Sequence, residues 1–89
     1  MREENNLKLN KLFDKYHLNE KNRQEILEII NPIFSHPEFQ KRMTKDFLHH
    51  SDITLGEHIL EDTIVTYLLL KKKKKTNYRM KLALTISML

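Results

Sequence analysis

His58 is an ionisable side chain in an otherwise apolar stretch, and Asp62 follows it four residues later. On a helix this spacing places the two side chains next to each other on one face. One interpretation is that His58 is a metal ligand whose ring is oriented by a neighbouring acceptor, either Asp62 or Glu61. The other is a core histidine hydrogen-bonded to Asp62. Spacing alone favours the second, because one histidine with one neighbour is a weak signal of a metal site.

Three other side chains that could bind a ligand precede His58 in the sequence: Arg42, His49 and His50. An arginine can grip a phosphate through two parallel hydrogen bonds. One of the two adjacent histidines could point from a loop into a pocket. The alternatives are an ordinary surface arginine and two solvated loop histidines, and the residues by themselves favour these alternatives.

The lysine run, residues 71–75, could contact nucleic acid or an anionic membrane. The chain has 16 basic residues against 12 acidic ones, and five of the basic residues lie in this run. The net charge of +4 is therefore one local cluster and not a basic face. Five consecutive lysines wrap around more than one helical turn, so a solvated helix C-terminus that complements the helix dipole is the favoured interpretation.

The remaining composition excludes several classes of site and of location. A single glycine, Gly56, excludes a glycine-rich phosphate loop, and the lack of cysteine excludes disulfides and thiolate metal sites. The first residues have no apolar signal segment, and no apolar run is long enough for a membrane span. A bacterial cytoplasmic protein is the expectation.

Helices must position these side chains. The chain has 89 residues, of which 39% are apolar and 31% charged, with one glycine, two prolines and no regular alternation of apolar and polar residues. This pattern predicts one all-α bundle of four or five helices.

Apolar residues at helical spacing define the first two predicted helices. The first is short and weakly capped, and it carries Leu9, Leu12, Phe13 and Tyr16. The second spans Glu20 to about Phe34, with Asn19 as its N-cap and a side formed by Ile26, Ile29, Ile30 and Ile33. Pro32 is expected to kink or end this helix.

A boundary is predicted at His36-Pro37, because a residue before proline is disfavoured in the helical region. A short helix from Glu38 to about Lys45 follows, with Phe39 and Met43 facing inward. A loop over residues 49–52 comes next.

The fourth predicted helix begins near Leu55, where Thr54 and Glu57 form a capping box, and runs to about Lys73. Its apolar residues point in two directions. Leu55, Ile59, Leu69 and Leu70 lie on one side, and Leu60, Ile64, Tyr67 and Leu68 lie on the other. A helix that is apolar nearly all round is expected in the middle of a bundle.

The last predicted helix begins near Tyr78 and is also apolar on most sides, with Leu82, Ala83, Leu84, Ile86, Met88 and Leu89. These side chains cannot all face one neighbour, because successive residues on a helix are about 100° apart. The helix stops at Leu89 without a capping glycine or polar tail. We therefore expect a truncated domain that self-associates through residues 78–89.

The stretch PEFQKRMTKDFLHHSDITLGEHILEDTIVTYLLLKKKKK resembles the opening of bacterial HD-domain metal-dependent phosphohydrolases. The family's early segment commonly has a phenylalanine-led helix, a His-Gly loop and a Glu-His pair that opens a long helix. Phe39, the loop 49–51 and Glu57-His58 fill these places here, with Ser51 in place of the loop glycine. The resemblance covers roughly residues 32–89, so residues 1–36 form an N-terminal helical segment and 37–89 the truncated HD-domain core.

The resemblance implies that His58 is the first metal ligand of the family motif and that Arg42 and His50 face a substrate phosphate. It implies a divalent cofactor (Mn, Fe, Mg, Co or Ni) and a phosphorylated small molecule or nucleotide as substrate. The family's His-Asp pair and distal Asp are absent from this chain. One imidazole cannot fix the geometry of an ion, so we expect no tightly bound metal and an inactive chain.

Three functions follow as hypotheses. The first is an N-terminal fragment of an HD phosphohydrolase, an incomplete version of that fold. The second is a small helical module that binds a partner protein. The third is anionic-surface binding through the lysine run.

Overall fold

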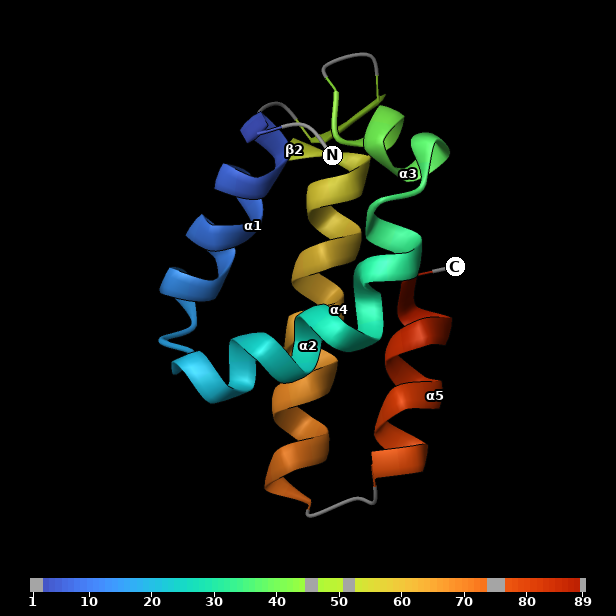
Figure 1. Ribbon diagram of the computed structural model, residues 1–89. Helices are drawn as coiled ribbons and strands as arrows, with labels where there is room; N and C mark the ends of the chain where they lie inside the picture. The colour runs from blue at the N-terminus through green and yellow to red at the C-terminus, as the bar shows by residue number, and fades with distance from the viewer. Residues whose placement is uncertain (1–2, 45–46, 51–52, 74–76, 89) are drawn as a thin grey trace.

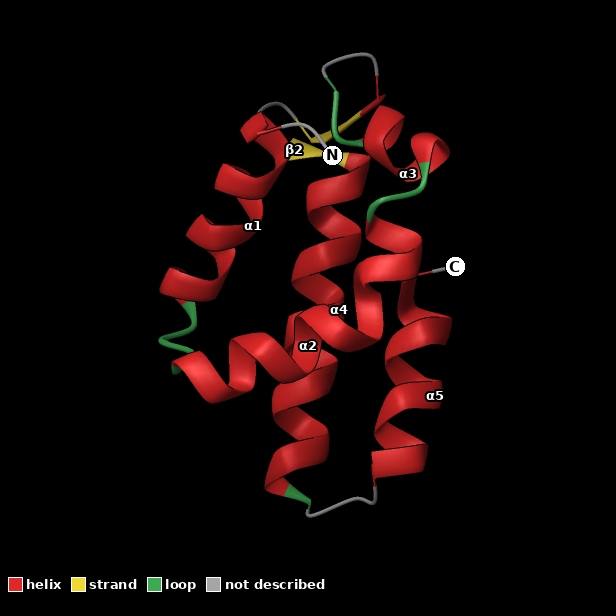
Figure 2. Ribbon diagram, in the orientation of Figure 1, coloured by secondary structure: helices red, strands yellow, loops and turns green. Residues whose placement is uncertain are grey.

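The computed structural model describes residues 3–44, 47–50, 53–73 and 77–88. These residues form a small all-α bundle, which confirms the predicted fold class (Figures 1 and 2). The helices and strands are α1 Glu3–Lys15, α2 Glu20–Phe34, α3 Pro37–Arg42, β1 Leu48–His50, β2 Ile53–Thr54, α4 Leu55–Lys72 and α5 Asn77–Met88.

Helix α2 has the predicted bounds and the predicted cap. The Asn19 side chain accepts a hydrogen bond from the Asn22 N–H at 2.8 Å. Pro32 lies inside the helix, which continues to Phe34. A proline removes one intrahelical hydrogen bond and crowds the preceding turn. The second half of α2 turns toward α3 (Figure 1).

The next two elements differ in part from the sequence prediction. Helix α3 begins at Pro37, with extended His36 as its cap, and ends at Arg42 instead of near Lys45. The predicted inward residues, Phe39 and Met43, are both buried. The segment expected to be a loop contains β1, which pairs with β2 in an antiparallel ladder of irregular register. Five strand residues carry too little alternation to be recognised in a sequence.

Helix α4 begins at the predicted capping box. Thr54 Oγ1 accepts a hydrogen bond from the Glu57 N–H at 3.2 Å, and its hydroxyl donates to Glu57 Oε1 at 3.0 Å. The helix contacts α1, α3, α5 and both strands, so the predicted central position is confirmed (Figure 1). Leu60 and Ile64 are buried on one side, whereas Leu69 on the other side is half exposed.

One apolar core joins the first helices to the last. It consists of buried side chains from every helix and from the segments that follow α1 and α3: Leu9, Phe13, Leu18, Ile26, Ile30, Phe34, Phe39, Met43, Leu60, Ile64, Tyr67, Leu84 and Met88. Residues 1–36 and 37–89, which the sequence suggested as separate segments, thus share a core over their described parts.

Helix α5 packs beside α4 with only one of its apolar sides. Leu84 and Met88 are buried, whereas Leu82 and Ile86 are largely exposed. Leu89 lies outside the described residues. The expectation that the apolar residues of this helix cannot share one neighbour is confirmed for those described. No described helix has the length and apolar character that crossing a membrane requires.

Candidate functional site

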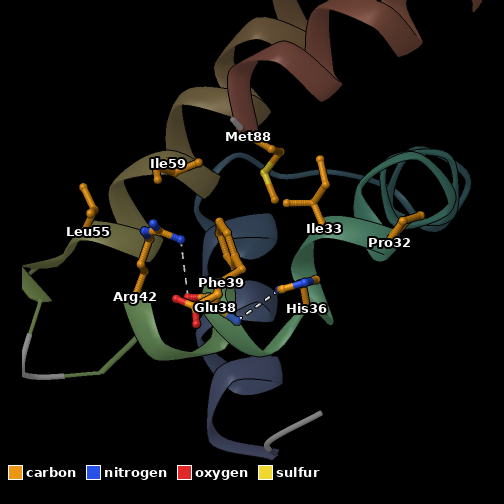
Figure 3. A pocket seen from close by; sticks show the side chains of 9 residues that line it. All are labelled: Pro32, Ile33, His36, Glu38, Phe39, Arg42, Leu55, Ile59 and Met88. Atoms are coloured by element: carbon orange, nitrogen blue, oxygen red, sulfur yellow. Dashed lines mark hydrogen bonds between the residues drawn. The ribbon is translucent and has the colours of Figure 1, made fainter.

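A cavity of about 500 Å³ opens where α2, α3, α4 and α5 meet. Its lining is mostly apolar, with one arginine, one histidine and one glutamate: Pro32, Ile33, His36, Glu38, Phe39, Arg42, Leu55, Ile59 and Met88 (Figure 3). Arg42 and Leu55 lie on one side in this view, Ile33 and Met88 lie on the other, and Phe39 lies between them. The volume is within the range of small-molecule sites, roughly 300–1,000 Å³.

Arg42 places a guanidinium beside these apolar walls. Its Nη1 donates one long hydrogen bond, 3.5 Å, to the backbone carbonyl of Glu38 one turn earlier. Within the described part of the chain, no carboxylate lies within ion-pair distance of this guanidinium. Its remaining N–H groups are therefore available to an anionic ligand.

His36 and Glu38 supply the other polar groups of the cavity. The Nδ1 atom of His36 accepts a hydrogen bond from the Glu38 N–H at 3.1 Å, which is the capping interaction of α3. In a neutral ring the proton then lies on Nε2, which can donate. The Glu38 carboxylate lies 3.8 Å from the Lys41 ammonium, and both side chains are exposed.

Buried and partly buried polar contacts hold α3 in place. Asn5 of α1 donates from Nδ2 to Oε1 of Gln40 at 2.6 Å, and Gln40 Nε2 donates to the Phe34 carbonyl oxygen. Lys8 Nζ donates to the Met43 carbonyl oxygen at 3.0 Å. These contacts tie the helix that carries Arg42 to α1 and to the end of α2.

Gly56 in the first turn of α4 lets α3 approach closely. A Cβ atom at this position would lie 2.6 Å from Met43 Sδ and 3.0 Å from the backbone carbonyl carbon of Arg42. Both distances are shorter than ordinary van der Waals contact, so a larger residue would require the Met43 side chain and the end of α3 to shift.

His58 and Asp62 lie side by side, as their spacing predicted. His58 Nε2 is 3.2 Å from Asp62 Oδ2, and the two side chains are 37% and 62% exposed. The pair is thus at the surface and not in the core. His58 does not line the Arg42 cavity.

Glu61, the other acceptor considered for His58, is bound to α1. Its Oε2 atom lies 2.6 Å from Lys15 Nζ and accepts a hydrogen bond from the Tyr16 hydroxyl at 3.0 Å. The bond from Lys15, supported by that from Tyr16, holds the pKa of Glu61 below its ordinary value, although burial acts in the opposite direction. Glu61 therefore fixes α4 against α1.

A second carboxylate is held in the same way between α2 and α4. Glu25 accepts a hydrogen bond from the Tyr67 hydroxyl and lies 3.0 Å from Lys71 Nζ. The Tyr67 hydrogen bond is the main cause of a lowered pKa of Glu25, and Lys71 adds to it. The first lysine of the run is thus paired.

These two carboxylates predict a loss of stability in acid. A group whose pKa is lower in the folded than in the unfolded state stabilises the fold above its unfolded value, here about 4.5, and this contribution is lost as the pH falls through the folded value. We expect the free energy of unfolding, measured by urea denaturation, to decrease as the pH falls below about 4.5. In Glu61→Gln the decrease should be shallower than in Glu28→Gln, a change at an exposed position of α2. Equal acid slopes in the two variants would contradict the assignment.

Within the described part of the chain, the donors near His58 do not make up the set that a divalent metal would need. Among the described residues, no three His, Cys, Asp or Glu side chains are grouped so that they could hold an ion. Asp62 is in an ion-pair contact with His58, and Glu61 is bound to Lys15. The His49 and His50 side chains, like Ser51, lie outside the described part of the structure.

Sequence reasoning identified Arg42 but missed the rest of the cavity. The sequence pattern indicated only structural roles for His36 and Phe39. It placed Met88 on the last helix but did not predict which helices this residue contacts. Cavity lining depends on which helices meet, and periodicity within one helix does not report it. The Asn5–Gln40 pair was also missed, because the two residues are 35 positions apart.

Comparisons with protein-family models, curated proteins and solved structures found no match to this chain.

Proposed function

We propose that this chain is the ligand-binding part of an HD-type phosphohydrolase fold and that it binds a phosphate monoester with an apolar group in the Arg42 cavity. The observation that carries the proposal is a guanidinium without a carboxylate partner among the described residues, beside a mostly apolar cavity of about 500 Å³. The family resemblance, which placed a substrate phosphate near Arg42, supports the same ligand class.

Each part of such a ligand has a counterpart in the cavity. The phosphate oxygens can accept two hydrogen bonds from the planar guanidinium of Arg42. The apolar group would contact Phe39, Ile59 and Met88. The Glu38 carboxylate at the rim would repel a second acidic group on the ligand, although the Lys41 ammonium partly balances the charge of this carboxylate.

The Arg42 site can be tested by titrating the chain with hexyl phosphate and following amide signals by NMR. We expect Arg42→Gln to weaken binding by roughly ten- to a hundredfold, because a hydrogen bond to a charged group contributes about 1.5–3 kcal/mol. Lys41→Gln is the matched control, since it removes one positive charge from the same helix but does not line the cavity. Inorganic phosphate and hexan-1-ol, which each carry half of the ligand, should bind more weakly than hexyl phosphate. Equal affinity in the two variants would refute the proposal.

Catalysis is expected to be absent from the isolated chain. The resemblance implies that His58 is a metal ligand, but the other family ligands, the His-Asp pair and the distal Asp, are not in this sequence. With manganese and a phosphate monoester, the released phosphate should equal that of a His58→Ala variant. Hydrolysis that depends on manganese and is lost in His58→Ala would show that the chain completes a metal site by itself.

A further inference from the structure

We propose that the end of the α4–α5 hairpin is a docking surface for anionic lipid membranes. The surface, called the hairpin tip below, consists of Leu69, Lys72 and Lys73 at the end of α4 and Lys81 and Leu82 near the start of α5. The two helices pack together, and these ends lie at the same end of the molecule (Figure 1). This inference does not depend on the proposed ligand of the Arg42 cavity.

Charge is distributed very unevenly along the chain. Asp62 is the last acidic residue, so residues 63–89 contain seven of the 16 basic residues and none of the 12 acidic ones. Residues 1–62 contain the other nine basic residues and all 12 acidic ones, a net charge of −3. The positive charge is therefore concentrated in residues 63–89, and such an asymmetry orients a protein toward an anionic surface.

The lysines near the end of the hairpin differ in their contacts. Lys71, which is not part of the tip, lies 3.0 Å from the Glu25 carboxylate and over the Tyr67 ring. Lys72, Lys73 and Lys81 are exposed, and none of them forms an ion pair with a described residue. Their ammonium groups can reach lipid phosphates while the long side chains lie along apolar surface.

Two leucines accompany these lysines. Leu69 is 52% exposed and Leu82 is 50% exposed. Each is a neighbour of an exposed lysine: Leu69 is one turn before Lys73, and Leu82 follows Lys81. Lysines with exposed leucines are typical of surfaces that lie in the headgroup region of a membrane.

The leucines favour a membrane over a nucleic acid. Binding to nucleic acid through lysines neutralises phosphates, and a leucine gains nothing from a phosphate backbone. A lipid bilayer offers both an anionic layer and an apolar layer immediately beneath it. The tip is also separate from the Arg42 cavity, because Lys72 is thirteen positions after Ile59 on α4, a rise of roughly 20 Å.

The test is co-sedimentation of the full chain with vesicles of equal parts phosphatidylcholine and phosphatidylserine. We expect binding to these vesicles, little binding to phosphatidylcholine alone, and a decrease with added salt. The variant Lys72→Gln/Lys73→Gln should bind about fivefold more weakly for each lysine removed. Lys11→Gln/Lys21→Gln, which removes the same charge from exposed positions on α1 and α2, should change binding much less.

The leucines require a separate variant. Leu69→Ser/Leu82→Ser should weaken vesicle binding about tenfold. Leu7→Ser, at a position on α1 that is 58% exposed, should leave it unchanged. Circular dichroism spectra like that of the parent chain would show that each variant is folded.

Three outcomes would overturn the proposal. The first is equal binding to neutral and anionic vesicles. The second is an equal loss in the Lys72/Lys73 and Lys11/Lys21 variants. The third is tighter binding to a duplex oligonucleotide that is unaffected by the leucine changes, which would assign the tip to nucleic acid.

Discussion

Replacing Tyr67 by alanine is expected to lower the free energy of unfolding by about 3–5 kcal/mol, the usual cost of removing a large buried aromatic side chain. Tyr67 is fully buried in the core, and its hydroxyl donates to Glu25 and lies 3.0 Å from Asn22 Oδ1. Small domains have a total stability of about 5–15 kcal/mol, so the variant would lose a large part of it.

The contribution of the hydroxyl can be separated from that of the ring. Burial, followed by the Glu25 hydrogen bond, raises the pKa of Tyr67 well above its ordinary value, so the group is a donor at any physiological pH. Tyr67→Phe keeps the ring and removes the donor, which should cost about 1–3 kcal/mol. It should also make the acid loss of stability shallower, because the main cause of the lowered pKa of Glu25 is gone.

Urea denaturation followed by circular dichroism measures these changes. Leu7→Ala, at an exposed position on α1, is the control and should change stability by less than about 0.5 kcal/mol. A loss in Tyr67→Ala no greater than in Leu7→Ala would mean that α2 and α4 do not pack as described.

Gly56→Val should destabilise the fold and also remove ligand binding at the Arg42 cavity. The Cβ atom would lie 2.6 Å from Met43 Sδ and 3.0 Å from the Arg42 carbonyl carbon, so the Met43 side chain and the backbone at the end of α3 must shift. Overpacking of this kind costs about 1–3 kcal/mol. Because α3 carries both Phe39 and Arg42, its displacement changes the cavity as well.

A double-mutant cycle tests the cause of this effect. Gly56→Ala introduces the same Cβ atom but improves helix propensity by about 0.5–1 kcal/mol, so its net cost should be smaller than that of valine. In a Met43→Ala background the nearest obstructing atoms are gone, and Gly56→Ala should become less destabilising or favourable. An unchanged cost in that background would show that the contact with Met43 is not the reason for glycine at this position.

Local signals in the sequence determined most of the helices. The Asn19 cap, the His36-Pro37 boundary and the Thr54-Glu57 capping box each depend on residues within three positions of one another, and the structure confirms all three. The central position of α4 followed from its apolar residues on two sides. The side-by-side placement of His58 and Asp62 followed from helical geometry alone.

Tertiary structure decided what the sequence could not. Periodicity shows that Phe39 and Met88 are on apolar sides of helices, but not that both line the cavity that contains Arg42. It shows that Glu61 can reach His58, but not that Lys15 and Tyr16 of α1 bind its carboxylate. Contacts across 35 to 46 positions arise only when helices pack, because each depends on the relative rotation of two helices. That rotation is set by the whole core. The sequence therefore predicted each helix and its cap separately, but it did not predict the site that the packed helices enclose.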